Sequence, residues 1–270
     1  MNADELRKLQ LLELKILLEI KRICDKHEIK FILIGGSLLG AIRHGGFIPW
    51  DDDIDIGMNR NDFNRFCSIA QAELSDEYIL DTKVLYNRCN CIIKIRLKNT
   101  HIIEYNDVRI PEFDGIFVDI FPFDVLPDSN LFGYFYYYWF NFVLRGYWIR
   151  SKYWFPNSFI GKINAITSYL LTLIIPKKRL KTFLDNYCQK YNDSETKRIV
   201  LLLSPKIKSH KYNATILTKT KQHSFEGIMF HIPEEHDLYL TIHYGDYMKL
   251  PPEKSRINEH IKKIDFGQYS

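Results

Sequence analysis

The sequence predicts an α+β protein, in which a mixed sheet with flanking helices is followed by a mostly helical second half. At 270 residues, 46% of them hydrophobic, the chain is long enough for one substantial domain or two small ones. Short runs with strand character lie at 31–34, 53–56 and 115–122. Helical or uncharged apolar stretches occupy 4–24, 130–144, 163–175 and 178–190. We place the boundary near Pro127–Asp128, with domains at 1–127 and 128–270 and the C-terminal segment packing back on the first domain.

The first helix is predicted from an amphipathic pattern between Asp4 and Cys24, with acidic residues near its start and frequent Lys and Arg. This pattern is typical of a surface helix packed on a core and not of a signal peptide. The five cysteines are scattered and form neither a disulfide framework nor a repeated metal-binding spacing. We therefore expect reduced thiols in a cytoplasmic protein.

A glycine turn follows the strand-like run at 31–34. Gly35 and Gly36 permit close approach of the backbone, and Ser37 is placed to cap a helix that covers 38–43. Such a turn presents backbone N–H groups to an anion, and the helix N-terminus adds a partial positive charge. The turn is therefore a candidate phosphate-binding element.

Four aspartates follow this helix within a short stretch, at Asp51, Asp52, Asp53 and Asp55. Carboxylates this close repel one another unless a metal ion or basic groups hold them ionised. Their alternation with isoleucine fits a strand on which Asp53 and Asp55 share one face. Because Mg²⁺ takes carboxylate and phosphate oxygens, the cluster predicts a metal site for phosphoryl chemistry.

Asp119 lies in the middle of the apolar run Gly115–Pro122. An aspartate there either is matched to a basic partner or completes the metal site, and the cost of a buried charge favours the metal site. Asp51 shares the face of Asp53 only if the strand begins early. For Asp52 we favour a solvated turn or an N-cap role.

From Gly35 to Ile56 the chain reads GGSLLGAIRHGGFIPWDDDIDI, and this stretch resembles the signature of the LicD family. That family includes phosphocholine transferases of bacterial surface glycans, is related to the fukutin group, and is similar to the wider nucleotidyltransferase superfamily. The resemblance continues at 115–122 and through the C-terminal stretches 225–227, 232–233 and 244–252. It implies a nucleotidyltransferase-like catalytic core. The family often has Thr at the position of Ser37, which keeps the hydroxyl.

The resemblance implies magnesium-dependent transfer of a phospho-alcohol to a sugar hydroxyl of a bacterial cell-surface glycan such as lipopolysaccharide, capsule or teichoic acid. Phosphocholine from CDP-choline is the expected donor group. One or two Mg²⁺ ions would be held by Asp53, Asp55 and Asp119, and Asp119 is either a further ligand or the base for the acceptor hydroxyl. Gly36 and Ser37 would contact the donor phosphates.

Two basic residues are weaker candidates for the same phosphates. Arg43 and Lys94 can each supply a cation, although an Arg on a helix or a Lys on a strand is more often a solvated surface charge. The stretch 244–247 has aromatic rings and a carboxylate that suit sugar hydroxyls. It either lines the acceptor pocket or forms a turn packed on the first domain.

Other functions stay open. Other members of the fold use glycerol or ribitol phosphate donors, and a nucleotidyltransferase acting on a small molecule or protein would release pyrophosphate instead of a nucleoside monophosphate. A non-enzymatic scaffold that retains the fold is the third alternative. The presence of all three candidate carboxylates argues against the scaffold.

The net charge of +4 and the pI near 8.6 are too weakly basic to indicate nucleic acid. The expected partners are a nucleotide-activated donor and a glycan or lipid-linked glycan acceptor. The apolar stretches 130–144 and 163–175 fall short of the roughly 20 residues of a spanning helix. They predict either core helices or a hairpin lying on a membrane, near the basic residues from Lys177 to Lys181. We expect a cytoplasmic protein, with the inner face of the cytoplasmic membrane as the place of any contact.

Overall fold

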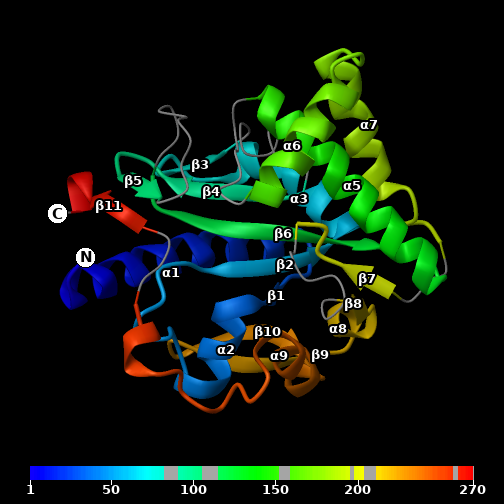
Figure 1. Ribbon diagram of the computed structural model, residues 1–270. Coiled ribbons are helices and arrows are strands. Elements are labelled where there is room, and N and C mark those ends of the chain that lie inside the picture. Colours follow the sequence, from blue (N-terminus) through cyan, green and yellow to red (C-terminus); the bar gives the residue numbers. More distant parts are fainter. Residues whose placement is uncertain are drawn as a thin grey trace. The chain divides into compact units, whose positions relative to one another are not determined.

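The computed structural model describes residues 1–81, 91–104, 115–151, 159–194, 198–203, 211–257 and 261–269. Its fold class is α+β, which confirms the prediction (Figure 1). The chain forms two compact units. The first comprises 1–81, 93–122 and 214–270, and the second comprises 82–92 and 123–213. Residues 214–270 thus group with the N-terminal part, and the division at Pro127–Asp128 stays a proposal about domains.

A sheet forms the centre of the first unit. Its strands follow the order β1 (Ile32–Leu33), β2 (Asp55–Asn59), β6 (Phe117–Val125), β4 (Ile93–Leu97) and β3 (Tyr78–Leu80). The pairs β1–β2, β4–β6 and β3–β4 are antiparallel. The register of β4 against β6 sets Lys94 opposite Asp119. Most of the side chains on β4 and β6 are buried, so these central strands carry the core.

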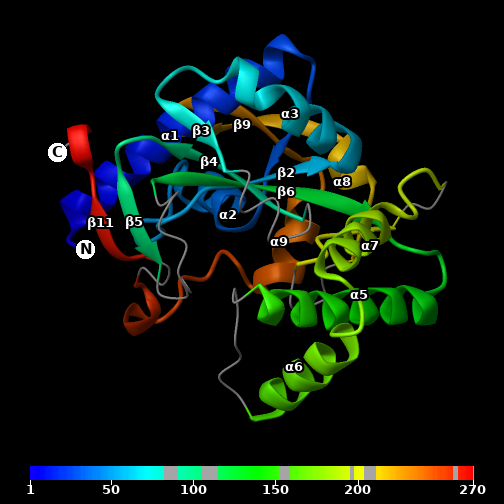
Figure 2. The ribbon, with the colours of Figure 1, turned by 90° about the horizontal axis from the view of Figure 1, so that it is seen from above.

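Two helices pack on this sheet. They are α1 (Ala3–Lys26) and α3 (Arg60–Glu73), which contact each other as well as the strands (Figures 1 and 2). The helix α1 confirms the prediction for residues 4–24. It begins with a capping box in which Asn2 and Glu5 exchange hydrogen bonds. Its buried side is apolar except for Gln10 and Glu13.

The helix α2 (Gly35–His44) begins directly after β1, three residues before the predicted start. Gly35 allows this because its φ of 55° lies in the left-handed region. Our prediction that Ser37 caps the helix is wrong. Ser37 lies in the first turn, and its Oγ accepts a hydrogen bond from the Asp55 backbone N–H at 2.9 Å. The hydroxyl therefore ties α2 to the first residue of β2.

The C-terminal part of the first unit consists of small elements. They are α8 (Thr215–Thr218), the hairpin β9 (Thr220–Phe225) and β10 (Ile228–Pro233), α9 (His236–Tyr244), 3₁₀ turns at Glu253–Ser255 and Gly267–Tyr269, and β11 (Ile261–Asp265), which pairs with β5 (His101–Glu104). At the hairpin turn, Glu226 accepts two hydrogen bonds from Arg7 and one from the Phe47 N–H at 3.0 Å. The hairpin thereby holds the loop that follows α2.

The second unit is mostly helical. Its helices are α5 (Asn130–Arg150), α6 (Phe159–Thr172) and α7 (Lys177–Gln189), and the end of β6 pairs there with β7 (Arg198–Val200), which pairs with β8 (Lys211–Asn213). Its core is built on the large rings of Tyr136, Phe140 and Tyr147. Among the described residues, no helix is both long and apolar enough to cross a membrane.

The cysteines at 24, 67, 91 and 188 form no disulfide. Burial raises the pKa of the Cys67 thiol to about 12, which disfavours the reactive thiolate. Cys89 lies outside the described residues.

We expect Gly40→Ala to lower the free energy of unfolding by about 1–3 kcal/mol. A Cβ at Gly40 would lie 2.4 Å from the Gly46 carbonyl oxygen and 3.2 Å from the Ile48 nitrogen, and both are backbone atoms. Gly45→Asn is the matched control, because Gly45 has open space around it and Asn tolerates its left-handed φ of 71°. Thermal unfolding measures both. A Gly40→Ala protein as stable as the control would contradict the close helix–loop contact.

Candidate active site

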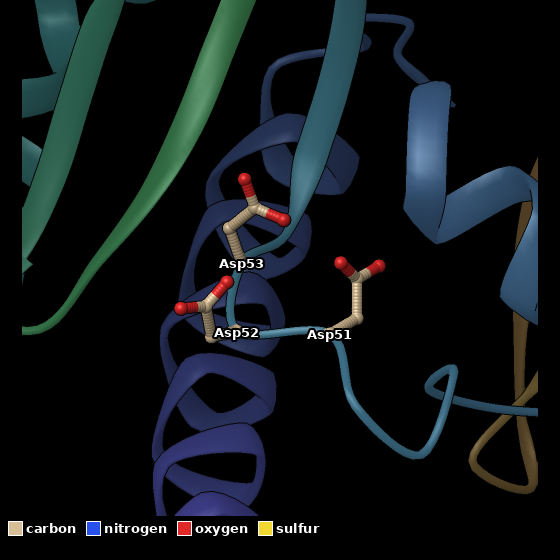
Figure 3. A group of neighbouring side chains, drawn as sticks. All are labelled: Asp51, Asp52 and Asp53. Carbon is tan, nitrogen blue, oxygen red and sulfur yellow. The ribbon is translucent and has the colours of Figure 1, made fainter. Parts of the chain in front are cut away.

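Three consecutive aspartates lie on the segment that leads into β2, in front of α1 (Figure 3). One carboxylate oxygen from each of Asp51, Asp52 and Asp53 lies within 4.8 Å of the others. At such separations the negative charges interact strongly when water is excluded. The three carboxylates are close together, as the sequence predicts, although β2 itself starts only at Asp55.

Asp51 lies against the N-terminal turn of α2. Its Oδ2 is 2.4 Å from the point where a Cβ of Gly36 would stand, so any larger residue would collide with the carboxylate. The backbone of Asp51 is held on both sides, since its N–H donates to the Ile48 carbonyl at 2.9 Å and its carbonyl accepts from Gln10 Nε2 at 2.9 Å. Gly36 thus makes room for a protein carboxylate beside the helix N-terminus.

Asp52 is buried, with 1% of its surface exposed. Its Oδ2 accepts a hydrogen bond from the Ile261 N–H at 3.0 Å, at the start of β11. The interpretation of Asp52 as a solvated turn residue is therefore wrong. No local pattern of residues predicts this contact, because the two residues stand 209 positions apart.

Asp55 also lies close to the glycine turn. Its Oδ2 is 2.9 Å from the point where a Cβ of Gly35 would stand. Burial raises its pKa well above the ordinary value, and the charges of Asp53, Asp119 and Asp51 raise it further, in that order. Asp119 joins the same neighbourhood, since its N–H donates to the Ile54 carbonyl at 3.0 Å. The three aspartates expected to bind metal thus lie in one electrostatic cluster.

Lys94 is the basic partner that the sequence left open for Asp119. Its Nζ lies 3.3 Å from Asp119 Oδ1 and 3.1 Å from the centre of the Phe117 ring. With 5% of its surface exposed, it is a buried cation and not a solvated surface charge. It offsets part of the carboxylate charge, because its own charge lowers the pKa of Asp55. A direct contact of Lys94 with donor phosphates stays a proposal.

A further carboxylate was missed by the sequence analysis. Glu13 on α1 is fully buried, and neither of its oxygens has a hydrogen-bond partner within the described part of the chain. Burial raises the pKa of Glu13 well above its ordinary value, followed by the charges of Asp53, Asp52, Asp51 and Asp119. A charged residue on the core side of the amphipathic helix was the available signal, one turn after the equally buried Gln10.

A cavity of about 620 Å³ opens beside the cluster in the first unit. Such a volume is within the range of sites for small ligands. Its lining combines the α2 turn and acidic segment with C-terminal residues: Gly36, Leu39, Arg43, Ile48, Trp50, Asp51, Asp52, Tyr244, Asp246, Tyr247, Lys249, Leu250, Pro251, Pro252, Ser255 and Ile257. The stretch 244–247 therefore lines a pocket, as it would if it contacted the acceptor.

Arg43 and Trp50 are held at the pocket by neighbours. Arg43 Nη1 donates to the Tyr247 carbonyl at 2.7 Å, and desolvation lowers its pKa. The rings of Trp50 and His44 are arranged edge-on, with centroids 6.1 Å apart. The Arg256 guanidinium lies over the Trp50 ring, 5.6 Å from its centroid. The wall of the pocket thus offers aromatic surface and cations beside the carboxylates of Asp51 and Asp52.

These residues fit a divalent cation by their chemistry. Several carboxylates converge, the oxygens of buried Glu13 accept no hydrogen bond from any described residue, and oxygen ligands are those that Mg²⁺ prefers. The compact group of Asp51, Asp52 and Asp53 overlaps with the predicted ligand set only at Asp53. The assignment of Asp53, Asp55 and Asp119 as ligands therefore stays a proposal.

Residues 28–178 match the family described as LicD/FKTN/FKRP, nucleotidyltransferase domain. The chain belongs to this family. It is 30% identical to the lipopolysaccharide cholinephosphotransferase LicD of Haemophilus influenzae, over 97% of this chain and 98% of that protein. The resemblance stated from the sequence is thereby confirmed.

Two further similarities are local. The ribitol 5-phosphate transferase FKRP of human is 47% identical over 45 residues, which is 17% of this LicD-family chain and 9% of FKRP. The uncharacterized protein RP689 of Rickettsia prowazekii is 33% identical over 75 residues, 28% of each chain. Each of these two similarities covers less than a third of this chain.

We expect Glu13→Gln to stabilise the protein at pH 8 in the presence of a chelator, by about 1–3 kcal/mol. Folding raises the pKa of Glu13, so the folded state holds this proton more tightly than the unfolded chain. The proton's contribution to stability is complete below the ordinary pKa of 4.5 and is lost as the pH rises above it. Denaturant unfolding at pH 4.5 to 8 measures the difference.

The amide variant should therefore show a flatter dependence of stability on pH, with the two proteins converging at the acidic end. Glu234→Gln, at an exposed position, is the control and should leave the slope unchanged. Parallel curves for wild type and Glu13→Gln would contradict the placement of Glu13 among the aspartates.

Proposed function

We propose that this protein transfers a phospho-alcohol, foremost phosphocholine from CDP-choline, to a sugar hydroxyl of a bacterial cell-surface glycan. Lipopolysaccharide, capsule and teichoic acid are the acceptor classes. The support is the similarity to a lipopolysaccharide cholinephosphotransferase along almost the whole chain. At the level of a phosphotransferase enzyme, the prediction made from the sequence is confirmed by this similarity.

The cavity of the first unit is the location that we propose for this reaction. The cavity of about 620 Å³ is lined by Gly36, from the N-terminal turn of α2, and by Asp51 and Asp52. A helix N-terminus favours phosphate oxygens, and carboxylates favour the cation that accompanies them. Both halves of a nucleotide-donor site thus face one cavity.

The reaction needs an acceptor oxygen to attack phosphorus while the bond from phosphorus to the CMP oxygen breaks. The acceptor proton goes to a carboxylate, and Asp119 is either this base or the third metal ligand. The α2 turn at Gly36 and Ser37 binds donor phosphate oxygens, and Arg43 adds charge from the same pocket. One or two Mg²⁺ ions held by Asp53, Asp55 and Asp119 would neutralise the charge on the phosphate oxygens.

The aromatic wall of the pocket supports choline as the transferred alcohol. Trp50, Tyr244 and Tyr247 line the cavity together with Asp246. A trimethylammonium group is attracted by its charge to aromatic faces and to a carboxylate, and the uncharged ribitol and glycerol groups lack this attraction. Glycerol and ribitol phosphates nevertheless remain alternative donor groups, the latter because of the local similarity to FKRP.

We place the reaction in the cytoplasm, at the inner face of the cytoplasmic membrane, because the donor is a nucleotide and a lipid-linked glycan is the proposed acceptor. Nucleotidyl transfer to a small molecule or protein is the second candidate. A scaffold that retains the fold is the third, and the charge cluster disfavours it because so many converging carboxylates are costly without a ligand.

The deciding experiment incubates the purified protein with Mg²⁺, CDP-choline, CDP-glycerol or CDP-ribitol, and a glycan extract, with mass spectrometry as readout. CMP release with a gain of phosphocholine on the glycan is the expected result. Pyrophosphate release from a nucleoside triphosphate, without CMP from any donor, would favour nucleotidyl transfer. No turnover and no thermal stabilisation by any nucleotide would favour the scaffold.

We expect Asp53→Asn and Asp119→Asn each to lower kcat about a hundredfold or more while the protein remains folded, because each removes charge from the site and little packing. Asp76→Asn, at an exposed position outside the cluster, is the matched control and should keep wild-type turnover. The rate of CMP release measures all three. Turnover close to wild type in either cluster variant would remove that residue from the mechanism.

A further inference from the structure

The helix α6 distributes its polar and apolar side chains in the opposite way to a surface helix of a water-soluble protein. Among the side chains of α6 that the structure describes, from residue 161 onward, the buried ones are small or hydroxylated, namely Ala165, Ser168 and Thr172. Its exposed side carries large aliphatic side chains, with Ile163, Ile166, Leu170 and Leu171 each at least half exposed. A surface helix in water normally shows the opposite order, with its apolar stripe facing the core.

The helix α6 lies against α5 (Figure 2). A Cβ at Gly146 of α5 would lie 2.6 Å from both Ser168 Oγ and Thr172 Oγ1, so the two backbones approach where side chains are smallest. Ser168 Oγ donates to the Phe142 carbonyl. Close approach over small residues with hydroxyl hydrogen bonds is typical of helix pairs whose outer surfaces face lipid.

The apolar surface continues beyond the end of α6. Leu173 and Ile174 follow it, and Ile174 is 87% exposed. Hydrogen bonds hold the backbone at this point, because Arg150 Nη1 donates to the Thr172 and Ile175 carbonyls at 2.5 and 2.7 Å. These bonds satisfy backbone groups at the helix end, which an apolar environment requires.

Charge indicates which apolar environment covers this face. Lys177, Lys178 and Arg179 follow the apolar residues immediately, and Lys178 and Arg179 are exposed. A basic run beside an exposed aliphatic surface complements anionic lipid headgroups. The helix has 14 residues, whereas a spanning helix needs about 20, so α6 is too short to cross a bilayer.

We propose that α6 and the adjoining residues 173–179 dock on an anionic lipid bilayer, with the aliphatic side of α6 in the interface and the basic run on the headgroups. Exposed rings on α5 suit the same environment, since Phe132, Phe135 and Trp139 stack in a row along the helix with centroids 6.3–6.4 Å apart. This inference does not rest on the proposed reaction.

Vesicle co-sedimentation tests it with the full chain, using phosphatidylcholine vesicles with and without 30% phosphatidylglycerol. We expect binding to the anionic vesicles. The double variant Leu170→Gln/Ile174→Gln should weaken it about tenfold or more. Lys178→Gln/Arg179→Gln should weaken it about fivefold per charge and reduce its dependence on salt.

Met229→Gln/Leu238→Gln is the control for the aliphatic pair, since it replaces exposed apolar residues of the first unit. It should bind like the wild type, and unfolding curves should show that all variants fold. Failure to bind anionic vesicles would overturn the proposal, as would equal binding by the Leu170→Gln/Ile174→Gln protein. A dimer that this double variant abolishes, in the absence of vesicle binding, would assign the face to a second copy of the chain.

Discussion

The mutual repulsion of carboxylates in a poorly hydrated site is the constraint on which the architecture of the first unit depends. Asp51, Asp52 and Asp53 place oxygens within 4.8 Å of one another, and burial, followed by the charges nearby, raises the pKa values of Asp55 and Glu13. Lys94 offsets only part of this charge, from its position beside Asp119. A site of this kind favours a cation. A divalent cation bound by carboxylates can also bind phosphate oxygens and stabilise their charge.

The surrounding structure holds these groups in place against their repulsion. Gly35 and Gly36 leave room for carboxylates at the start of α2, and the hydroxyl of Ser37 ties that helix to β2. Gln10 from α1 and the Ile261 N–H from β11 hold the acidic segment from opposite ends of the sequence. The C-terminal residues therefore complete both the scaffold and the wall of the pocket.

The sequence predicted the parts of this site that depend on local spacing. The glycine turn, the helix after it, the strand around Asp119 and the aspartate cluster all follow from periodicity and from the chemistry of neighbouring residues. Contacts between distant segments were not predictable in this way. The carboxylate of Asp52 is held by a hydrogen bond from β11, and Glu13 comes within electrostatic range of the aspartates because α1 packs on the sheet. The role of Ser37 was mistaken because Gly35, with its left-handed φ, lets α2 begin three residues earlier.

We infer that a divalent cation relieves the repulsion at this cluster, and a calorimetric titration of the metal-free protein with Mg²⁺ is the experiment that measures this. We expect saturable binding together with a rise in stability of about 2.7 kcal/mol at a Mg²⁺ concentration one hundred times the dissociation constant. Asp53→Asn should weaken both effects, while Asp76→Asn should not. No heat of binding and an unchanged unfolding temperature for the wild type at millimolar Mg²⁺ would contradict the claim.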